Sequence, residues 1–313
     1  MEISIKPLGH IYRHEPKSDW AITHAQVPFL FKVNETEYRV YYSTRDSKSR
    51  SSVTFVSLDV ETLTIHESSI DAPLLTRGKP GTFDDSGTMP SWIVEHNNEL
   101  WMYYTAWNRS KNASYRLSIG LAKSIDGGLT FHKMFKGPIL DRGRNDPIWV
   151  GQPCVLKDDD IWKMWYLSCQ KISIIESIPE PFYNVRYATS DDGINWNREE
   201  ITCIDFDENT DAIGRPCVWI YDGKYFMLHS NRKATGYRTD SEAGYRIVLS
   251  TSENGKSWNQ VETFQVSKNE AWANVMTEYC SVAPTEKEGT FLVLYNGNGF
   301  GASGFGGLLL TIS

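Results

Sequence analysis

A short tag recurs along this chain at a spacing of a little over sixty residues. It reads SIDGGLTF from Ser124, SDDGINW from Ser190 and SENGKSW from Ser252. A weaker copy, SLDVETLTI, begins at Ser57. In the full tags an Asp or Asn can cap a tight turn, Gly supplies a positive φ, and an aromatic residue packs beneath the turn. Self-similarity at a fixed period is the sequence signature of a repeat architecture.

A second element repeats with the same period. Proline followed by strand-like residues occurs at Pro28, Pro90, Pro153 and Pro216, which are almost evenly spaced. Cys280 takes the place of the proline in a fifth copy, one further period along the chain. Each copy is followed by a turn and a second strand-like run, such as YRVYYSTR after the first. One unit therefore reads as strand, turn, strand, loop, strand with tag, strand.

Five units of this period use up the 313 residues of the chain. Four-stranded units repeated around an axis form a β-propeller, so we expect one all-β domain, residues 1–313, with five four-stranded blades. The last unit ends after its third strand, GGLLLTIS, and the N-terminal segment EISIKPL or GHIYRHE is expected to supply the missing outer strand and close the ring. A two-domain β-sandwich is the alternative, but it does not require such a regular period.

Composition excludes several function classes. A net charge of −7 provides no basic field for nucleic acid or an anionic membrane, and no apolar run approaches the roughly 20 residues that span a bilayer. The N-terminal residues lack the apolar segment of a secretion signal, which favours a cytoplasmic location. The five cysteines have no metal-site spacing and are expected to be buried free thiols. Nothing in the sequence indicates the oligomeric state.

The first strand of each propeller blade lines the central channel, and ligands usually bind at the mouth where these strands begin. The residues just before each repeated proline are therefore the candidates, and each of the five stretches contains a carboxylate. A single loop acid often only caps a turn, but five stretches that converge on one axis are a stronger signal. The catalytic candidates are Asp85, Glu278, Asp146 and Asp211.

Other polar and aromatic residues near these stretches are candidates for substrate binding. Arg215 is suited to holding a carboxylate or phosphate or to orienting an acid, with a structural ion pair as the alternative. His24 is either a base or donor to a sugar hydroxyl, or a satisfied interior histidine. Aromatic side chains here either stack on sugar rings or belong to the core between blades. The full binding set is His24, Gln26, Arg45, Asp46, Trp107, Gln152, Arg215, Arg232, Tyr279 and Asn296.

The glycine-rich segment Tyr295–Gly307 has two interpretations. It lacks the lysine of a phosphate-binding P-loop and follows a strand without opening a long helix. We expect it either to bring Asn296 and Asn298 close to the channel or to form a flexible hairpin.

Longer motifs support a family resemblance. The segments GTFDDSGTMPSW, YYTAWN, SIGLAKSIDGGLTF, GPIL, YATSDDGINW, GRPCV and YNGNGFG resemble proteins described as similar to glycoside hydrolase family 43. With the repeat, nearly the whole chain resembles the five-bladed propeller glycosidases of families 43, 32 and 130. This resemblance implies a propeller fold, a carbohydrate ligand and a link to bacterial surface-polysaccharide biosynthesis.

The chain departs from the family pattern at the acids. Family 43 enzymes carry an Asp directly before the inner-strand proline in the first and third blades, and a Glu two residues before it in the fourth. The corresponding residues here are Val27, Gln152 and Gly214. Inverting hydrolysis needs an acid and a base about 6.5–9.5 Å apart. Catalytic acids must therefore come from elsewhere, and Glu278 stands out because it lies two residues before Cys280.

Three functions remain open. The leading interpretation is an enzyme that makes or breaks a glycosidic bond on a surface-polysaccharide or nucleotide-sugar-related substrate, with Asp85 and Glu278 as acid and base. The second is transfer or phosphorolysis of an activated sugar, in which Arg45, Arg215 and Arg232 hold phosphate. The third is a non-catalytic glycan-binding propeller, which the missing family acids favour. No cofactor is expected. A structural or substrate-orienting Ca²⁺ in the channel, as several propeller enzymes have, stays open as an alternative, although no spacing demands one.

Overall fold

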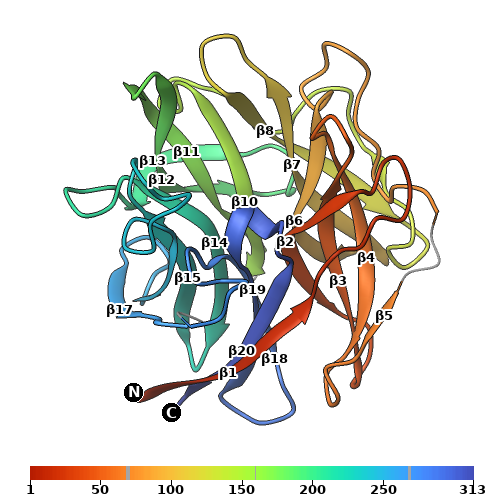
Figure 1. Ribbon diagram of the computed structural model, residues 1–313, viewed down its shortest axis with the longest axis vertical. Helices are drawn as coiled ribbons and strands as arrows, with labels where there is room; N and C mark the ends of the chain where they lie inside the picture. The colour runs from red at the N-terminus through yellow and green to blue at the C-terminus, as the bar shows by residue number, and fades with distance from the viewer. Residues whose placement is uncertain (68–70, 159, 267–268) are drawn as a thin grey trace.

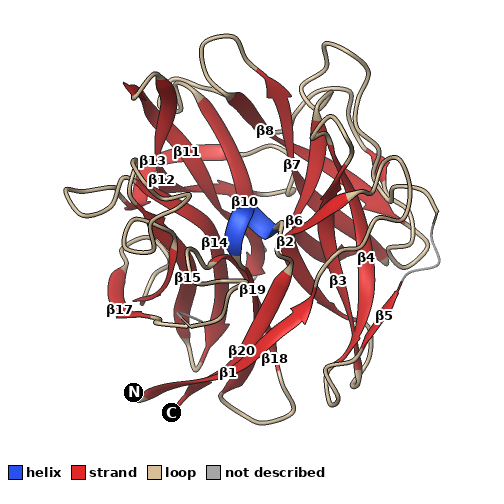
Figure 2. Cartoon of the chain, in the orientation of Figure 1, coloured by secondary structure: helices blue, strands red, loops and turns tan. Residues whose placement is uncertain are grey.

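The computed structural model describes residues 1–67, 71–158, 160–266 and 269–313. Within these residues the regular structure is almost entirely strand, and the only helix is the short α1 (Asn298–Gly301). Figure 2 shows α1 near the middle of the view, with strands around it. The predicted all-β class is confirmed.

The strands form three sheets (Figure 1). The first contains β1 (Ile3–Tyr12), β18 (Glu278–Pro284), β19 (Thr290–Asn296) and β20 (Phe305–Ile312). The second contains β2 (Thr23–Lys32), β3 (Glu37–Arg45), β4 (Ser51–Asp59), β5 (Ile65–Glu67), β6 (Gly87–His96), β7 (Glu99–Arg109), β8 (Tyr115–Ser124) and β9 (His132–Lys133). The third contains β10 (Trp149–Asp158), β11 (Ile161–Ile175), β12 (Ile178–Ser190), β13 (Asn197–Ile204), β14 (Ala212–Tyr221), β15 (Lys224–Arg232), β16 (Arg246–Ser252) and β17 (Asn259–Thr263).

The two ends of the chain meet in the first sheet, whose strand order is β1-β20-β19-β18. Strand β1 pairs antiparallel with β20, so that Ile3 lies opposite Ile312, and Figure 1 shows both termini together. The N-terminal segment thus supplies the outer strand beside the last strands, as the sequence predicts.

Each of the other sheets consists of two antiparallel groups that meet at one parallel residue pair. In the second sheet this pair is Ser51 of β4 and Gly87 of β6. In the third it is Tyr183 of β12 and Ala212 of β14. All other neighbouring strands in these sheets pair antiparallel, as consecutive strands joined by hairpin-like connections do.

The four strands that carry the repeated prolines, together with β18, which carries Cys280 at the same place, surround a common axis. Strand β2 contacts β6, β6 contacts β10, β10 contacts β14, β14 contacts β18, and β18 contacts β2. Aromatic side chains fill the space further out between strand groups; for example, the Trp101 ring of β7 stacks on Trp162 of β11 with centroids 5.8 Å apart. This arrangement places the starts of five strands at one end of the axis.

Arg215 of β14 links the strands around this axis. Its guanidinium donates hydrogen bonds to the carbonyl oxygens of Pro28 (2.7 Å), Tyr279 (3.2 Å) and Ser91 (3.2 Å), which belong to three other inner strands. Its backbone N–H donates to the Gln152 side chain of the remaining inner strand at 3.0 Å. One fully buried residue therefore ties together all five inner strands.

The repeated tags form the turns that the sequence predicts. In the second full tag the Asp192 carboxylate accepts hydrogen bonds from the backbone N–H groups of Ile194 and Asn195, at 2.8 and 2.7 Å. The glycine that follows Asp192 has a φ of 73°. The tags also bind to the preceding unit through Tyr41 to the Gly128 carbonyl, Tyr103 to Gly193 and Trp165 to Gly255. The tag is therefore both a turn and a latch between units.

We expect Asp192→Ala to lower the free energy of unfolding by about 1 kcal/mol, because it removes a cap comparable to a helix N-cap. Burial acts to raise the pKa of Asp192, but hydrogen bonds from Asn195, Ile194 and Ser190 outweigh it and lower the pKa to about 2. The ionised Asp192 carboxylate therefore stabilises the folded state fully above the usual Asp pKa. This stabilisation is lost as the pH falls through the pKa that Asp192 has in the folded protein. Urea unfolding at pH 7 and pH 3 measures both effects. Asp191→Ala is the matched control, and equal losses in the two variants would contradict the prediction.

All five cysteines are buried and none is in a disulfide, in agreement with the sequence analysis. Among the described residues no helix has the length and apolar character that a membrane crossing requires.

Candidate functional site

A cavity of about 290 Å³ lies at the end of the axis where the inner strands begin. Antiparallel pairing brings the ends of the second strands and the starts of the third strands to this same end. Accordingly, the cavity is lined by Gln26 and Gln152 from first strands, Arg45 and Trp107 from the ends of second strands, and Tyr115 from the start of a third. The volume is just below the range of about 300–1,000 Å³ that is usual for small-molecule sites.

Bulges in the inner strands shape this end of the axis. Pairing of β10 with β11 is interrupted between Gly151 and Cys154, and similar breaks occur in β2, β14 and β18. Gln152 and Tyr279, inside two of these bulges, have φ values of 46° and 58° and line the cavity. A β-bulge re-aims a side chain, and backbone strain in non-glycine residues concentrates at functional sites.

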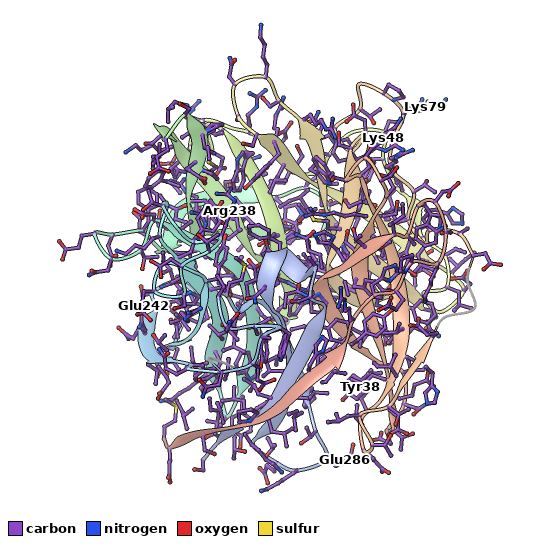
Figure 3. The ribbon with its side chains drawn as sticks, viewed as in Figure 1. Tyr38, Lys48, Lys79, Arg238, Glu242 and Glu286 are labelled. Atoms are coloured by element: carbon purple, nitrogen blue, oxygen red, sulfur yellow. The ribbon has the colours of Figure 1, made fainter. Side chains whose placement is uncertain are left out.

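Three arginines line the cavity. Arg45 donates to the Gln26 side chain at 2.8 Å. Arg232 is buried, and its Nε donates to the Tyr245 hydroxyl at 3.0 Å. Arg238 lies in the loop between β15 and β16, toward the central part of the molecule in Figure 3, and pairs with Glu180 at 2.6 Å.

Aromatic rings form much of the remaining wall: Trp107, Trp149, Tyr183, Tyr237, Tyr245 and Phe300. The guanidinium of Arg232 lies over the Tyr237 ring, 4.0 Å from its centroid, and also faces Tyr183 and Tyr245. Such cation–π contacts are worth about 2 kcal/mol when they are desolvated. The rings thus help to fix the position of Arg232 in the cavity wall.

Glu278 lies beside the cavity, next to Tyr279, which lines it. The side chain is fully buried, and neither carboxylate oxygen has a hydrogen-bond partner among the described residues. Burial raises the pKa of Glu278 well above its usual value, although the charges of Arg232 and Arg45 and the Tyr279 hydroxyl act in the opposite direction. A buried acid without partners is costly for stability, which makes it a candidate for function.

The glycine-rich segment closes one side of the cavity through Phe300 of α1. Asn296 is fully buried and bonds the backbone of β2, accepting from Val27 N–H and donating to the Ala25 carbonyl, each at 2.7 Å. A Cβ on Gly301 would lie 2.9 Å from the Gln26 Cα, so a side chain there would collide with β2. The segment is therefore anchored by specific contacts instead of forming a flexible hairpin.

The structure brings six of the predicted binding residues to the cavity: Gln26, Arg45, Trp107, Gln152, Arg232 and Tyr279. His24, Asp46, Arg215 and Asn296 are not part of its lining. His24 contacts the α1 segment, and burial and the charge of Arg45 lower its pKa to about 3. Asp46 pairs with Arg50 and Arg77. The guanidinium of Arg215 donates to backbone carbonyl oxygens, which matches none of the roles considered for it: holding an anionic ligand, orienting an acid or forming an ion pair.

The four predicted catalytic acids also lie outside the lining. Asp85 accepts hydrogen bonds from the Gly81 N–H and the Ser86 hydroxyl, both at 2.9 Å. Asp211 accepts from the Ala234 N–H at 2.7 Å. Both acids therefore act as local caps in this structure, which is the alternative that the sequence left open. Of the four, Glu278 alone lies directly beside the cavity.

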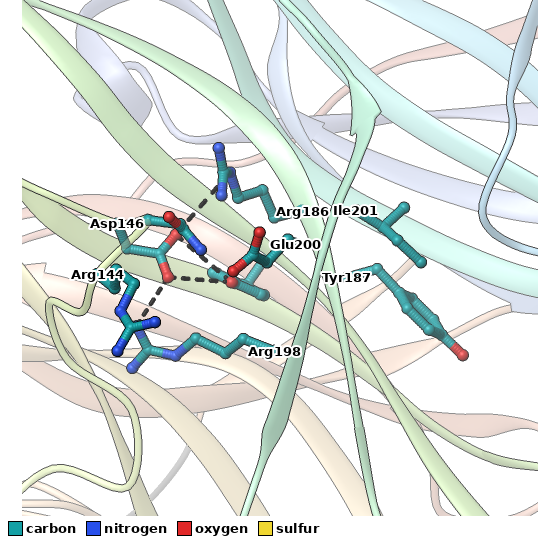
Figure 4. Close-up of a pocket in the computed structure, with 9 residues that line it drawn as sticks. Arg144, Asp146, Arg186, Tyr187, Arg198, Glu200 and Ile201 are labelled. Atoms are coloured by element: carbon teal, nitrogen blue, oxygen red, sulfur yellow. Dashed lines mark hydrogen bonds and ion pairs between the residues drawn. The ribbon is translucent and has the colours of Figure 1, made fainter.

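Asp146 belongs to a second, more peripheral pocket, which Figure 4 shows with Arg144, Arg186 and Arg198 around it. Its carboxylate pairs with Arg198 at 2.7 Å and accepts from the Tyr166 hydroxyl at 3.2 Å. With these partners Asp146 is well satisfied, and we assign it a structural role.

Sequence reasoning missed several cavity residues. Tyr115, Tyr183, Tyr237, Arg238 and Tyr245 come from third strands and from the loop between β15 and β16, not from the stretches before the prolines. The concentration of Tyr and Arg in YNVRY and in TGYRTD is the signal that could have indicated Tyr183, Tyr237 and Arg238. Among the described residues no group of three or more His, Cys, Asp or Glu side chains is placed to hold a metal ion.

Comparisons with solved structures show the fold. A glycoside hydrolase matches with a TM-score of 0.71 at 15% identity, over 99% of this chain and 93% of that one. A thermostable family-43 glycoside hydrolase matches with a TM-score of 0.65 at 18% identity, over 96% and 91%. A Bombyx mori family 32 β-fructofuranosidase, in complex with sucrose, matches with a TM-score of 0.64 at 17% identity, over 96% and 61%. The chain thus has the fold of glycosidase-like propellers.

Sequence comparison gives full-length relatives. No family model matches the chain. The uncharacterized proteins MT1551 and Rv1502 of two Mycobacterium tuberculosis strains are each 32% identical to it over 308 residues, which cover 96% of this chain and 97% of each relative. At that identity over nearly the whole length, the chain belongs to the same family as these two mycobacterial proteins, a family with a glycosidase-like propeller fold.

Proposed function

We propose that this protein binds a saccharide in the central cavity and makes or breaks a glycosidic bond there, on a surface-polysaccharide or nucleotide-sugar-related substrate. The observation that carries the proposal is the cavity itself, in which flat aromatic rings, amide groups and guanidinium donors converge beside a buried acid. Sugar rings present apolar faces to aromatic side chains and hydroxyl edges to donors and acceptors. Solved structures with this fold include a sugar complex, which supports the choice of ligand.

Glu278 and Tyr279 are the residues that we assign to proton transfer. A raised pKa holds Glu278 toward its protonated form, which suits a general acid. Tyr279 is its neighbour in the chain and lines the cavity, so its hydroxyl is the group that contacts the ligand. The Tyr279 hydroxyl also acts on the pKa of Glu278, and we assign the proton transfer from Glu278 to this hydroxyl to the ligand-bound state, in which the two groups come within hydrogen-bond distance. Protonation of the glycosidic oxygen lets the leaving group depart as a neutral alcohol.

Transfer to an anionic or activated acceptor fits this site better than hydrolysis. Among the described residues no carboxylate belongs to the cavity lining, so a general base that would activate water is not in place. An acceptor such as phosphate is already a nucleophile and needs no such base. The same observation favours a second candidate, a propeller that binds glycans without cleaving them.

The proposal also includes the number of propeller blades and the cellular location. We infer that the strands form five four-stranded blades of one domain spanning residues 1–313, supported by the circle of contacts among the inner strands and by β1 beside β20. A cytoplasmic location stays a prediction.

The proposed function is tested with nucleotide sugars and nitrophenyl glycosides, with and without phosphate, in wild type, Tyr279→Phe and Trp107→Ala. Tyr279→Phe should lower kcat by about 10²–10⁴-fold with little change in KM, since it removes only the proton relay. Trp107→Ala should chiefly raise KM. Saccharide binding without turnover in the wild type would support the binding protein instead, and an absence of both would contradict the proposal.

A further inference from the structure

The charges around the central cavity are unbalanced. Three arginines line it, whereas no carboxylate does so among the described residues. Glu180 balances Arg238, to which it is bonded. Within the part of the chain that the structure describes, neither Arg45 nor Arg232 has a carboxylate oxygen within ion-pair distance. Two positive charges at the cavity therefore lack a counter-charge.

Arg232 is the more buried of these two cations. Its three nitrogens donate to the Tyr245 hydroxyl and to the carbonyls of Lys233 (2.8 Å) and Pro181 (3.1 Å). A guanidinium has five N–H donors, so two remain after these contacts. Burial of a charge is unfavourable unless an opposite charge or sufficient hydrogen bonds compensate it. An anion in the cavity would supply that compensation.

Arg45 approaches the same region from another strand. It donates to Gln26 and is partly buried, and its charge acts together with that of Arg232 on Glu278. Glu278 does not cancel the two charges, because burial holds the carboxyl toward its uncharged form. Arg45 and Arg232 thus create a positive potential in a small cavity with largely aromatic walls.

We propose that the saccharide bound in the central cavity itself carries an anionic group, a carboxylate or a phosphate, and that Arg45 and Arg232 hold this group. This inference rests on the proposed function, because it specifies the substrate class of the same cavity. Arginine binds both groups through two parallel hydrogen bonds, so the chemistry is shared between them. Arg238, whose charge Glu180 balances, is not assigned to the anion.

Calorimetry with matched sugars tests the inference. The probes are glucose, galactose and mannose, each as the neutral methyl glycoside, the uronic acid and the 1-phosphate, together with inorganic phosphate. We expect at least one acidic sugar to bind ten-fold or more tightly than its neutral counterpart, with an affinity that falls as salt is added. Uronic acids and sugar phosphates form separate arms that identify which anion is preferred.

Arg45→Gln should weaken binding of the acidic sugar by ten-fold or more, and by a larger factor than binding of the matched neutral sugar. Arg144→Gln, at the peripheral pocket, should change neither affinity. If Arg45→Gln does not fold, the salt dependence of the wild-type protein still tests the inference. Equal affinity for neutral and acidic sugars would overturn it and leave the proposed function standing. A neutral sugar that binds tightly only in the presence of inorganic phosphate would also overturn the inference, because the anion would then be a separate ligand. The proposed function would again stand. If no saccharide binds, the proposed function fails as well.

Discussion

Replacement of Arg215 by Met is expected to lower the free energy of unfolding by several kcal/mol. The substitution keeps an apolar stem of similar length but removes the donors to the carbonyl oxygens of Pro28, Ser91 and Tyr279. Each buried acceptor left without a donor costs about 1–3 kcal/mol. Because these carbonyls lie on three different strands around the axis, the loss also removes the link between them. This is the largest single-residue effect that we predict for the fold.

Urea unfolding monitored by tryptophan fluorescence measures this effect. Arg215→Lys should fall between wild type and Arg215→Met, since an ammonium group cannot reproduce the planar arrangement of guanidinium donors. Arg144→Met, at an exposed position, is the control and should change stability by less than about 0.5 kcal/mol. A loss for Arg215→Met no larger than about 1 kcal/mol, the cost of a single unsatisfied acceptor, would show that the inner strands do not depend on this link.

The second large effect concerns Glu278 and pH. Its pKa is raised in the folded protein by burial, so as the pH increases the unfolded chain releases the proton first. The stabilisation that comes from the protonated carboxyl is complete below the usual Glu pKa and is lost as the pH rises toward the folded-state pKa. Over that window the free energy of unfolding should fall by up to about 1.4 kcal/mol per pH unit. Glu278→Gln has no proton to lose and should not show this slope.

The measurement compares wild type with Glu278→Gln by urea unfolding at pH 6, 7 and 8. The difference between the two proteins cancels the other titrating groups, among them His229, whose pKa burial lowers to about 4. Glu286→Gln, at an exposed position, is the control and should retain the wild-type slope. Parallel curves for wild type and Glu278→Gln would mean that Glu278 is already ionised in the folded state, and that it is no proton donor.

Much of the fold was predictable because its signals are local and repeated. The Asp192 tag turns as expected because its capping atoms and its glycine lie within a few residues. The pairing of β1 with β20 followed from counting strands in the last unit. The hydrogen bond from the Tyr103 hydroxyl to the Gly193 carbonyl joins residues far apart in the sequence, and no local pattern predicts it.

The candidate site was predictable only in part. The stretches before the prolines, and before Cys280 in the fifth copy, contain Gln26, Gln152 and Tyr279, which lie at bulges and line the cavity. Carboxylates in the same stretches were harder to interpret. A loop acid such as Asp85 can accept hydrogen bonds from its own turn as readily as it can contact a ligand. Whether an acid caps a turn or faces the channel depends on loop conformation.

The sequence by itself determined the all-β class, the order of the strands, the turns of the tags and the end of the axis at which the cavity lies. These features depend on periodicity and on contacts between near neighbours. The tertiary structure decided which groups share the cavity, why Arg215 contacts carbonyls, and that Glu278 is buried without a partner while Arg45 and Arg232 lack a counter-charge among the residues that the structure describes. Burial and charge balance depend on which side chains from distant strands meet, and only the closed ring of strands brings them together.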